Sequence, residues 1–408
     1  GALQINGTAS TPTVFTLDTD DNYGTPADLY NDGPGNDTYR SGNWFTFTAT
    51  SIDTANIIRN AVIKGATNAI NLASASPTID STYFEQNDYG VRLGGVSAPT
   101  VTGNTFNNLR YTPLLISLVS YPDSTGGNTM SGTTYPAIGV LSETLVQDAT
   151  LAYRSFGGRT GIPYYFTSTY TVGTNSTLTV DPGVISKFNF GQLVVNRGLV
   201  ADGGSTPDSA IVFTSIEDDF YGGDTNRDST ATSVVRNQWT GIRYTGTAID
   251  NISILDNVIV RGSTDGVLAD NASPTITNSS LNTNTYGVRV YGSGDPVVNN
   301  SDIYNNFTFG IENRDKTFTI DATNNWWGDD SGPTHSGNPS GTGDEVTDGV
   351  DYTPFQGSGT TNPALGDVSL NGNVQSFDAS LILQDVATLI TFSALQESVA
   401  DVTGDGSV

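Results

Sequence analysis

The stretch SPTIDSTYFEQNDYGVRLGGVSAP, residues 76–99, returns as SPTITNSSLNTNTYGVRVYGSGDP at residues 273–296. In the first copy Pro77 recurs as Pro99, and in the second copy Pro274 recurs as Pro296 with the same spacing. Short apolar runs in both copies are separated by Gly, Asn, Asp and Pro, the residues that turns favour. A period of this length predicts one turn of a β-solenoid, with three short strands joined by turns.

A longer period lies above the short one. IIRNAVIKGATNAINLASASPTI from Ile57 aligns without a gap with ILDNVIVRGSTDGVLADNASPTI from Ile254. The opening GALQINGTAS begins partway through the equivalent stretch of the second copy, so the first copy is expected to lack a coil. The sequence therefore predicts superunits over residues 1–160 (N-terminally incomplete) and 161–355, a linker over 356–366, and a terminal module over 367–408.

The composition favours strands over helices. Val, Ile, Thr, Tyr and Phe are plentiful, and the apolar residues alternate in short runs such as ISILDNVIVRG, as they do when alternate side chains fill a narrow core. Asn residues at the turns, as in TGNTFNN, suit left-handed backbone conformations and stacked amide ladders. We therefore predict an all-β chain, a parallel β-helix with a small helical module at its end.

The charge excludes two classes of partner. The chain carries 16 Lys and Arg against 42 Asp and Glu, a formal charge of -26. This charge repels nucleic acid and anionic membrane surfaces, so we expect neither as a partner. No apolar run is long enough to cross a bilayer, and no membrane insertion is expected. The sequence contains no cysteine, and because its opening residues look like the interior of a repeat we expect it to be a mature or partial product.

Several segments carry a family resemblance. They are TLTVDPGVISKF at 177–188, DDFYGGDTNRD at 218–228, YPAIGV at 135–140, NNWWGDDSGP at 324–333 and VDYTPF at 350–355. Residues 1–355 resemble secreted bacterial right-handed parallel β-helix repeat proteins. The resemblance implies that handedness and an extracellular location, either secreted or on the bacterial cell surface. It leaves the activity open, because such proteins include polysaccharide lyases, hydrolases, epimerases, adhesins and structural surface proteins.

The C-terminal stretch has the spacing of calcium-binding loops. In the first loop, oxygen-bearing side chains recur at the loop positions that ligate Ca²⁺, with Gly372 at position 6, and a segment with apolar residues at helical spacing follows. A second loop begins at Asp401 and stops at position 8, Val408, before its last ligand position. The predicted Ca²⁺ ligands are Asp367, Ser369, Asn371, Asn373 and Asp378 in the first loop, and Asp401, Thr403, Asp405 and Ser407 in the second.

This pair of loops around a helix resembles a type I dockerin over residues 367–408. The resemblance implies two Ca²⁺ ions and docking to a cohesin-like protein. Ser369 and Asn371 stand where such loops often have carboxylates, so the first loop is expected to bind Ca²⁺ more weakly. The alternative is a solvated acidic turn that binds no ion.

A further acidic stretch lies within the predicted solenoid. GGDTNRD places Asp224, Asn226 and Asp228 at alternate positions, after Asp218 and Asp219. Alternate oxygen ligands in a tight loop can point toward one cation, so we predict a Ca²⁺ site there. The equivalent stretch of the first superunit, residues 18–22, is acidic as well. The alternative is a polar loop that protrudes from the solenoid.

No residue is nominated as catalytic. His335 is the only histidine and has no nucleophile motif beside it, and the lack of cysteine excludes Cys–His chemistry. Arg92 and Arg289 occupy equivalent YGVR positions, which favours an architectural role over proton transfer. Trp326 and Trp327 are expected to cover the last coil, the alternative being that exposed indoles stack on sugars.

These observations predict a non-enzymatic structural or adhesive protein of the cell surface or extracellular matrix, stiffened by Ca²⁺. Its terminal module would attach it to a cohesin-like protein or to neighbouring copies of itself, and the latter would build head-to-tail filaments. The alternative is a dockerin-borne carbohydrate-active enzyme, either a polysaccharide lyase or a glycoside hydrolase, or a glycan-binding module with a polysaccharide as its partner.

Overall fold

The computed structural model describes residues 1–24, 40–204, 206, 209–229, 231–359, 366, 368, 376–387 and 400. They form an all-β parallel solenoid of about 12 turns with one short α-helix. Contacts divide the chain into two units. Unit 1 comprises residues 1–170, 185–189 and 216–233, and unit 2 comprises 171–184, 190–215 and 234–408. No helix within the described ranges has the length and apolar character needed to cross a membrane.

Unit 1 contains one 3₁₀ helix, η1 (Asp53–Ala55), and the following strands: β1 (Gln4–Asn6), β2 (Thr13–Phe15), β3 (Asn43–Thr48), β4 (Ile57–Arg59), β5 (Ala61–Lys64), β6 (Asn68–Ala73), β7 (Thr78–Asp80), β8 (Tyr83–Glu85), β9 (Tyr89–Gly94), β10 (Thr100–Thr102), β11 (Thr105–Asn107), β12 (Leu114–Ile116), β13 (Thr129–Ser131), β14 (Ile138–Val140), β15 (Thr144–Leu145), β16 (Ala149–Leu151), β17 (Tyr164–Phe166) and β20 (Ile185–Phe188). The next strand after β17, β18 (Tyr170–Val172), begins at the last residue of the first segment of unit 1.

Unit 2 contains the 3₁₀ helix η3 (Asp250–Ile252), the helix α1 (Ser376–Val386) and the following strands: β19 (Thr177–Val180), β21 (Phe190–Val195), β22 (Gly198–Asp202), β23 (Ile211–Ser215), β24 (Trp239–Tyr244), β25 (Ser253–Asp256), β26 (Val258–Arg261), β27 (Ser263–Asp270), β28 (Thr275–Thr277), β29 (Ser280–Asn282), β30 (Tyr286–Tyr291), β31 (Val297–Asn299), β32 (Asp302–Tyr304), β33 (Phe309–Asn313), β34 (Ile320–Asp321) and β35 (Val350–Asp351).

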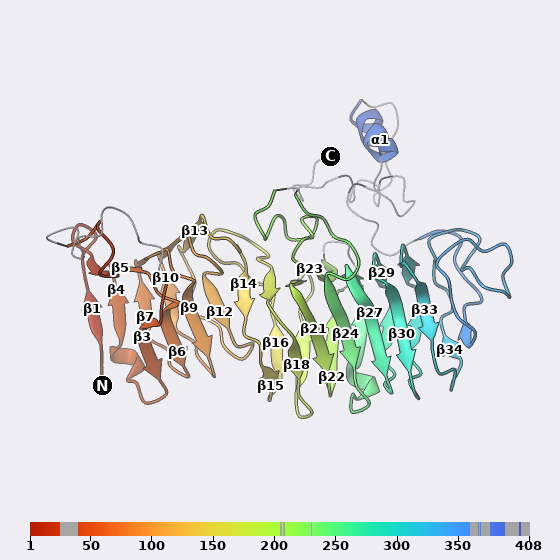
Figure 1. The fold of residues 1–408 in the computed structure, drawn as a ribbon, viewed down its shortest axis with the longest axis horizontal. Helices are drawn as coiled ribbons and strands as arrows, with labels where there is room; N and C mark the ends of the chain where they lie inside the picture. The colour runs from red at the N-terminus through yellow and green to blue at the C-terminus, as the bar shows by residue number, and fades with distance from the viewer. Residues whose placement is uncertain are drawn as a thin grey trace. The chain divides into compact units, whose positions relative to one another are not determined.

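The turns contribute their strands to five parallel sheets, and the strands of successive turns lie side by side within each sheet (Figure 1). In unit 1 the ladder β4–β7–β10 pairs Ile58 with Ile79 and Ile79 with Val101. All three side chains are fully buried, so equivalent positions of successive turns stack into one core column. The step from Ile79 to Val101 equals the spacing of Pro77 and Pro99, so the period that the sequence predicts is confirmed.

Buried asparagines join successive turns, as the sequence predicts. Asn104 donates from Nδ2 to the carbonyl of Ile79 at 3.0 Å, and its Oδ1 accepts from the backbone N–H of Thr82 at 2.9 Å. Asn128 repeats the arrangement one turn later, with Val101 and Asn104 as its partners. Asn284 and Asn306 form a comparable ladder in unit 2, and Asn325 makes the same kind of bond to the preceding turn in another column, with Val298 as its partner. These amides satisfy backbone groups that would otherwise be buried without partners.

Candidate metal centre

The candidate centre lies on a long loop of unit 1, residues 216–229, which we call the acidic loop. Gly222 and Gly223 turn this loop with φ of 72° and 68°, a left-handed conformation that glycine adopts at little cost. Two basic side chains of the same unit hold the loop in place. One is Lys187 on strand β20, and the other is Arg159 from the segment before β17.

Lys187 is fully buried against the acidic loop. Its Nζ donates to the carbonyls of Asp218 and Gly223, both at 2.7 Å. Burial lowers the pKa of Lys187 to about 8, and the nearby carboxylates of Asp218, Asp219 and Asp224 oppose that shift. Lys187 therefore fixes the backbone of the loop through two carbonyls rather than by pairing with one carboxylate.

Arg159 fixes the same loop at a neighbouring point. Its guanidinium donates to the carbonyl of Gly222 at 2.8 Å and to that of Pro136 at 3.1 Å. Burial, with a smaller contribution from the positive charge of Arg227, lowers the pKa of Arg159. Charge-assisted bonds of this kind are stronger than neutral ones, so the loop is held in a defined conformation before any ligand binds.

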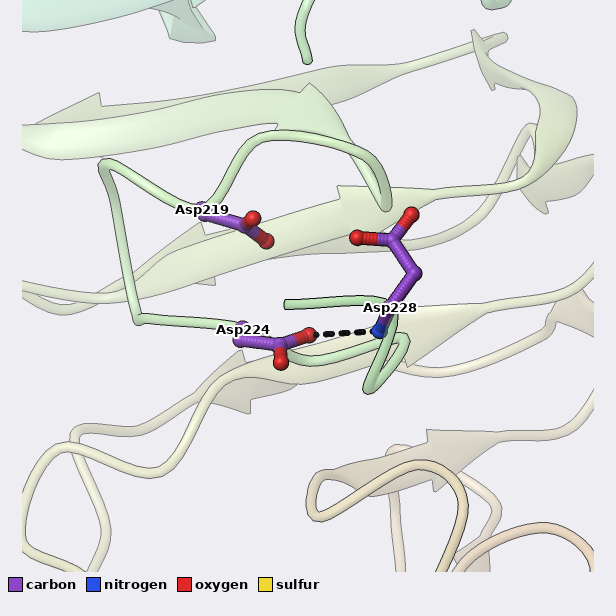
Figure 2. Close-up of side chains that lie close together, drawn as sticks. All are labelled: Asp219, Asp224 and Asp228. Carbon is purple, nitrogen blue, oxygen red and sulfur yellow. Dashed lines mark hydrogen bonds between the residues drawn. The ribbon is translucent and has the colours of Figure 1, made fainter. Parts of the chain in front are cut away.

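Three side chains of the acidic loop form what we call the carboxylate cluster: Asp219, Asp224 and Asp228. A carboxylate oxygen from each lies within 4.8 Å of the others. Figure 2 shows Asp219 and Asp228 reaching toward each other from opposite sides of the loop, and Asp224 accepting a hydrogen bond from the backbone N–H of Asp228. That bond is 3.2 Å long, and the other oxygen of Asp224 accepts from the N–H of Ser229 at 3.0 Å.

The carboxylate cluster is electrostatically unfavourable without a counterion. Burial, then repulsion from Asp224 and Asp228, raises the pKa of Asp219, and Lys187 only partly offsets this. Oδ1 of Asp219 and Oδ1 of Asp228 are shielded from solvent and have no hydrogen-bond donor in the described structure. Hard carboxylate oxygens of this kind are the ligands that Ca²⁺ prefers, so the residues fit a divalent cation.

The structure places the sequence-predicted ligands of this site in different roles. Asp224 and Asp228 belong to the carboxylate cluster, whereas Asn226 donates from its Nδ2 to Asp228 at 2.9 Å. A hydroxyl donor, Thr232, also bonds Asp228, and this bond is the main cause that lowers the pKa of Asp228. Asp219 also belongs to the cluster, although the sequence prediction rested on the alternate positions 224, 226 and 228. Its place in the same acidic stretch was the only sequence signal for it.

The acidic stretch of residues 18–22, which aligns with this loop in the sequence, is arranged differently. Asp20 forms a buried ion pair with Lys64 at 2.9 Å and also accepts hydrogen bonds from Thr16 and Asn22. Burial would raise the pKa of Asp20, but these hydrogen bonds outweigh it and lower the pKa to about 2. A lysine thus supplies the positive charge next to Asp20 that a cation would otherwise provide. Among the described residues, only the carboxylate cluster brings three potential metal ligands together.

Of the ligands predicted in the terminal module, the structure describes only Asp378. It lies in the first turn of α1 and is buried. Val368 and Ala400 are buried against Leu381 and Ile382 of the same helix. Asp367, Ser369, Asn371, Asn373, Asp401, Thr403, Asp405 and Ser407 lie outside the described residues. The helix is where the sequence predicts it, and both calcium loops stay predictions.

The paired tryptophans cover the end of the solenoid, as predicted. Trp327 is fully buried, and Trp326 is 5% exposed and packs on Tyr304 with ring centroids 5.4 Å apart. Gly359 lies against the Trp326 ring, so the first residues of the predicted linker are packed on the last turn. Neither indole offers an open face for stacking on a sugar.

His335 is held by its surroundings, which include the hydroxyl of Tyr352 at 3.4 Å from Nδ1 of the imidazole. Its Nδ1 accepts from the backbone N–H of Gly337 at 3.0 Å, and its Nε2 lies 3.2 Å from the carboxylate of Asp348. This arrangement fits a neutral imidazole with its proton on Nε2, which donates to Asp348. Through these contacts His335 stabilises the loop around residues 335–338 near the end of the solenoid.

Residues 196–342 match the family model described as Right handed beta helix region. None of the curated proteins and none of the solved structures matches the chain. The matched segment and the parallel ladders together support a right-handed β-helix repeat protein. This fold hosts both structural and carbohydrate-related proteins, so function has to be argued from the individual sites.

Proposed function

We propose that this chain is a calcium-binding structural or adhesive protein, secreted to the bacterial cell surface or extracellular matrix. The observation that carries the proposal is the carboxylate cluster on a loop that Lys187 and Arg159 already hold in place. A bound Ca²⁺ would supply positive charge to this site. Because Lys187 and Arg159 already hold the acidic loop in place, less conformational entropy would be lost when the loop orders around the ion.

Polar and aromatic side chains elsewhere serve the stacking of turns, which supports a structural role. Tyr89 stacks on Tyr111, Tyr111 on Tyr135 and Tyr135 on Tyr165, with centroids 4.9, 6.3 and 4.5 Å apart. The ring faces within this column are directed at one another, so the column presents mainly ring edges and is a poor platform for sugars. Arg92 likewise donates to Asn71 of the preceding turn at 2.9 Å.

The terminal module completes the proposal. By its resemblance to a dockerin, it would attach the solenoid to a cohesin-like protein or to a neighbouring copy, and attachment through it would require Ca²⁺ as well. Calcium would then have two effects, stabilising the solenoid at the carboxylate cluster and enabling attachment at the module.

Replacing Asp224 by Asn should remove one bound Ca²⁺ from the full chain. The amide oxygen of Asn can still accept from the N–H of Asp228, whereas the N–H of Ser229, which is exposed, exchanges its bond for one to water, so we expect the fold to stay intact. We expect native mass spectrometry to show one ion fewer than in the unchanged chain. At Ca²⁺ about tenfold above its dissociation constant, the thermal stabilisation by Ca²⁺ should fall by about 3 °C.

Asp123→Asn is the matched control, because Asp123 is exposed in the same unit and its replacement changes the net charge equally. Its ion count and its response to Ca²⁺ should equal those of the unchanged chain. An unchanged ion count in Asp224→Asn would refute calcium binding by the carboxylate cluster. It would leave the proposal for the terminal module untouched.

One observation favours the alternative of a carbohydrate-active protein. On unit 2, Arg289 contacts Glu312 at 2.6 Å and Asp265 at 3.5 Å, and its guanidinium lies 4.1 Å from the centroid of the Tyr286 ring. Two carboxylates, an arginine and an aromatic ring are groups that lyases and hydrolases use. Here, however, Arg289 already bonds both carboxylates across β27, β30 and β33, as expected for structural ion pairs between successive turns.

The structural proposal predicts that no cleavage occurs. Incubating the full chain with plant and algal polysaccharides, with and without Ca²⁺, should give neither unsaturated products nor new reducing ends. Products that disappear in Asp265→Asn would replace the structural proposal by the enzymatic one. A variant of the exposed ion pair Lys316–Asp348, Asp348→Asn, serves as the control for a charge change in the same unit.

A further inference from the structure

A pocket of about 290 Å³ opens in unit 1, apart from the residues of the carboxylate cluster. One wall is the segment of residues 118–121 after strand β12, and another is formed by residues 147–150 around the start of strand β16. Arg154 completes the lining. This volume is at the lower end of the range for ligand pockets, so it suits a single ring or residue rather than a long chain.

Arg154 is held rigidly at this pocket by two tyrosines. Its guanidinium lies 3.6 Å from the centroid of the Tyr121 ring, which is a close cation–π contact. Its Nε donates to the hydroxyl of Tyr164 at 3.1 Å, and that hydroxyl donates to the carbonyl of Ala152 at 2.7 Å. Tyr164 is 1% exposed, so this support is part of the core.

No carboxylate in the part of the chain that the structure describes forms a salt bridge with Arg154. Its partners are the Tyr121 ring and the Tyr164 hydroxyl, although acidic residues outnumber basic ones by 42 to 16. Arg40, Arg59 and Arg110 of the same unit do have acid partners, whereas Arg92 and Arg159 resemble Arg154 in bonding neutral groups. A preorganised guanidinium without an acid partner is matched in geometry to an external carboxylate, which it can bind through two parallel hydrogen bonds.

Other polar residues of the lining select for a second feature of the ligand. Gln147, Asp148 and Thr150 line the pocket together with Arg154. A simple anion would meet the negative charge of Asp148, whereas a ligand with hydroxyl or ammonium donors beside its carboxylate would satisfy both charged residues. Leu118 supplies an apolar part of the wall against which a ring or a short carbon skeleton can pack.

We propose that this pocket binds a small carboxylate that also carries hydrogen-bond donors. Such a ligand is a sugar acid or an amino acid, with its carboxylate on Arg154 and its donors toward Asp148 and Gln147. The site is independent of the carboxylate cluster, and its occupation requires no Ca²⁺.

The test uses the full chain in calcium-free, low-salt buffer with three probes: glucuronate, glutamate and glucose. Isothermal titration or ligand-observed NMR should detect binding of at least one of the two carboxylates, with glucose much weaker. Arg154→Gln should weaken that binding by about tenfold or more, equivalent to about 1.4 kcal/mol. Arg110→Gln is the control, because Arg110 also stacks on a tyrosine, Tyr111, and does not line the pocket.

The pattern across the probes identifies the ligand class. Binding of glucuronate alone indicates a sugar acid, binding of glutamate alone indicates an amino acid, and binding of both supports the shared chemistry. If Arg154→Gln fails to fold, Arg154→Lys keeps the charge but lacks the fork, and should still weaken binding several-fold. Glucose binding as tightly as glucuronate, no binding of any probe at about 10 mM, or unchanged affinity in the folded variant would overturn the proposal.

Discussion

Asn104→Ala is expected to lower the free energy of unfolding of unit 1 by about 3–5 kcal/mol. The side chain is fully buried and joins two turns of the solenoid. Removing it leaves the carbonyl of Ile79 and the N–H of Thr82 buried without partners, and each such group costs about 1–3 kcal/mol. The lost contacts of the amide itself add to this. Chemical denaturation followed by circular dichroism would measure the change.

Asn107→Ala is the matched control, three positions further along the same turn. Asn107 is half-buried, and its amide donates a long bond, 3.3 Å, to Glu85 at the surface. We expect a loss below about 1 kcal/mol there, as for most surface changes. Asn104→Asp should cost at least as much as Asn104→Ala at neutral pH, because it buries an unpaired carboxylate against the carbonyl oxygen of Ile79. Equal effects of Asn104→Ala and Asn107→Ala would show that the ladder contributes little.

Solenoids often unfold in steps, because each turn contacts only its neighbours. The loss in Asn104→Ala should therefore appear in the transition of unit 1 and leave that of unit 2 unchanged. Such a separation would also show that the two contact units are energetically distinct. A single shared shift of the whole unfolding curve would show instead that they unfold together.

The repeat of the solenoid could be predicted from the sequence because it is encoded locally. Apolar alternation, turn glycines and the asparagine before each strand recur at a fixed spacing, and equivalent positions such as Ile58 and Ile79 then stack by necessity. The φ of 51° at Asn257 and of 49° at Asn278 shows the same local rule in unit 2. Local rules of this kind are readable without knowing which distant segments meet.

The carboxylate cluster was only partly predictable from the sequence. Its geometry depends on contacts with distant residues, and the repeat pattern does not encode these contacts. The acidic loop is an insertion, and its position is set by Lys187, which is distant from Asp218 in the sequence. Nothing in the spacing of Asp224, Asn226 and Asp228 shows that Asp219 approaches them or that Asn226 turns to bond Asp228. The two acidic stretches looked equivalent, yet a lysine of β5 converts the first of them into an ion pair.

The asparagine ladder of unit 2 ends on an acid, and this end is expected to make the stability of unit 2 depend on pH. Asn284 bonds Asn306, and Asn306 donates from its backbone N–H and its Nδ2 to one oxygen of Asp344, at 2.9 and 2.8 Å. Burial raises the pKa of Asp344 to about 7, and the hydrogen bonds from Asn306 and Asn305 only partly oppose this. Where the ladder would otherwise continue with an amide, it ends on a group that titrates.

The sign of the effect follows from the direction of the shift. The pKa of Asp344 is raised from 3.8 to about 7 in the folded protein, so the folded state binds this proton more tightly than the unfolded chain does. The contribution to stability is fully present below about pH 4 and is lost as the pH rises to about 7. At 1.36 kcal/mol for each unit, the loss is at most about 4 kcal/mol.

Asp344→Asn should abolish this pH dependence, because an amide cannot ionise and its oxygen can still accept both bonds from Asn306. We expect the variant to match the unchanged chain near pH 4 and to exceed its melting temperature near pH 8, measured on unit 2. Asp348→Asn is the contrasting control, since hydrogen bonds from Lys316 and His335 lower the pKa of Asp348. The ionised Asp348 stabilises the fold, so Asp348→Asn should lower the melting temperature at neutral pH if it changes it. A difference between Asp344→Asn and the unchanged chain that stays constant from pH 4 to 8 would mean that Asp344 does not titrate in this range. The ladder would then end on a permanently charged group, and the cost of burying that charge would be present at every pH at which the protein is folded.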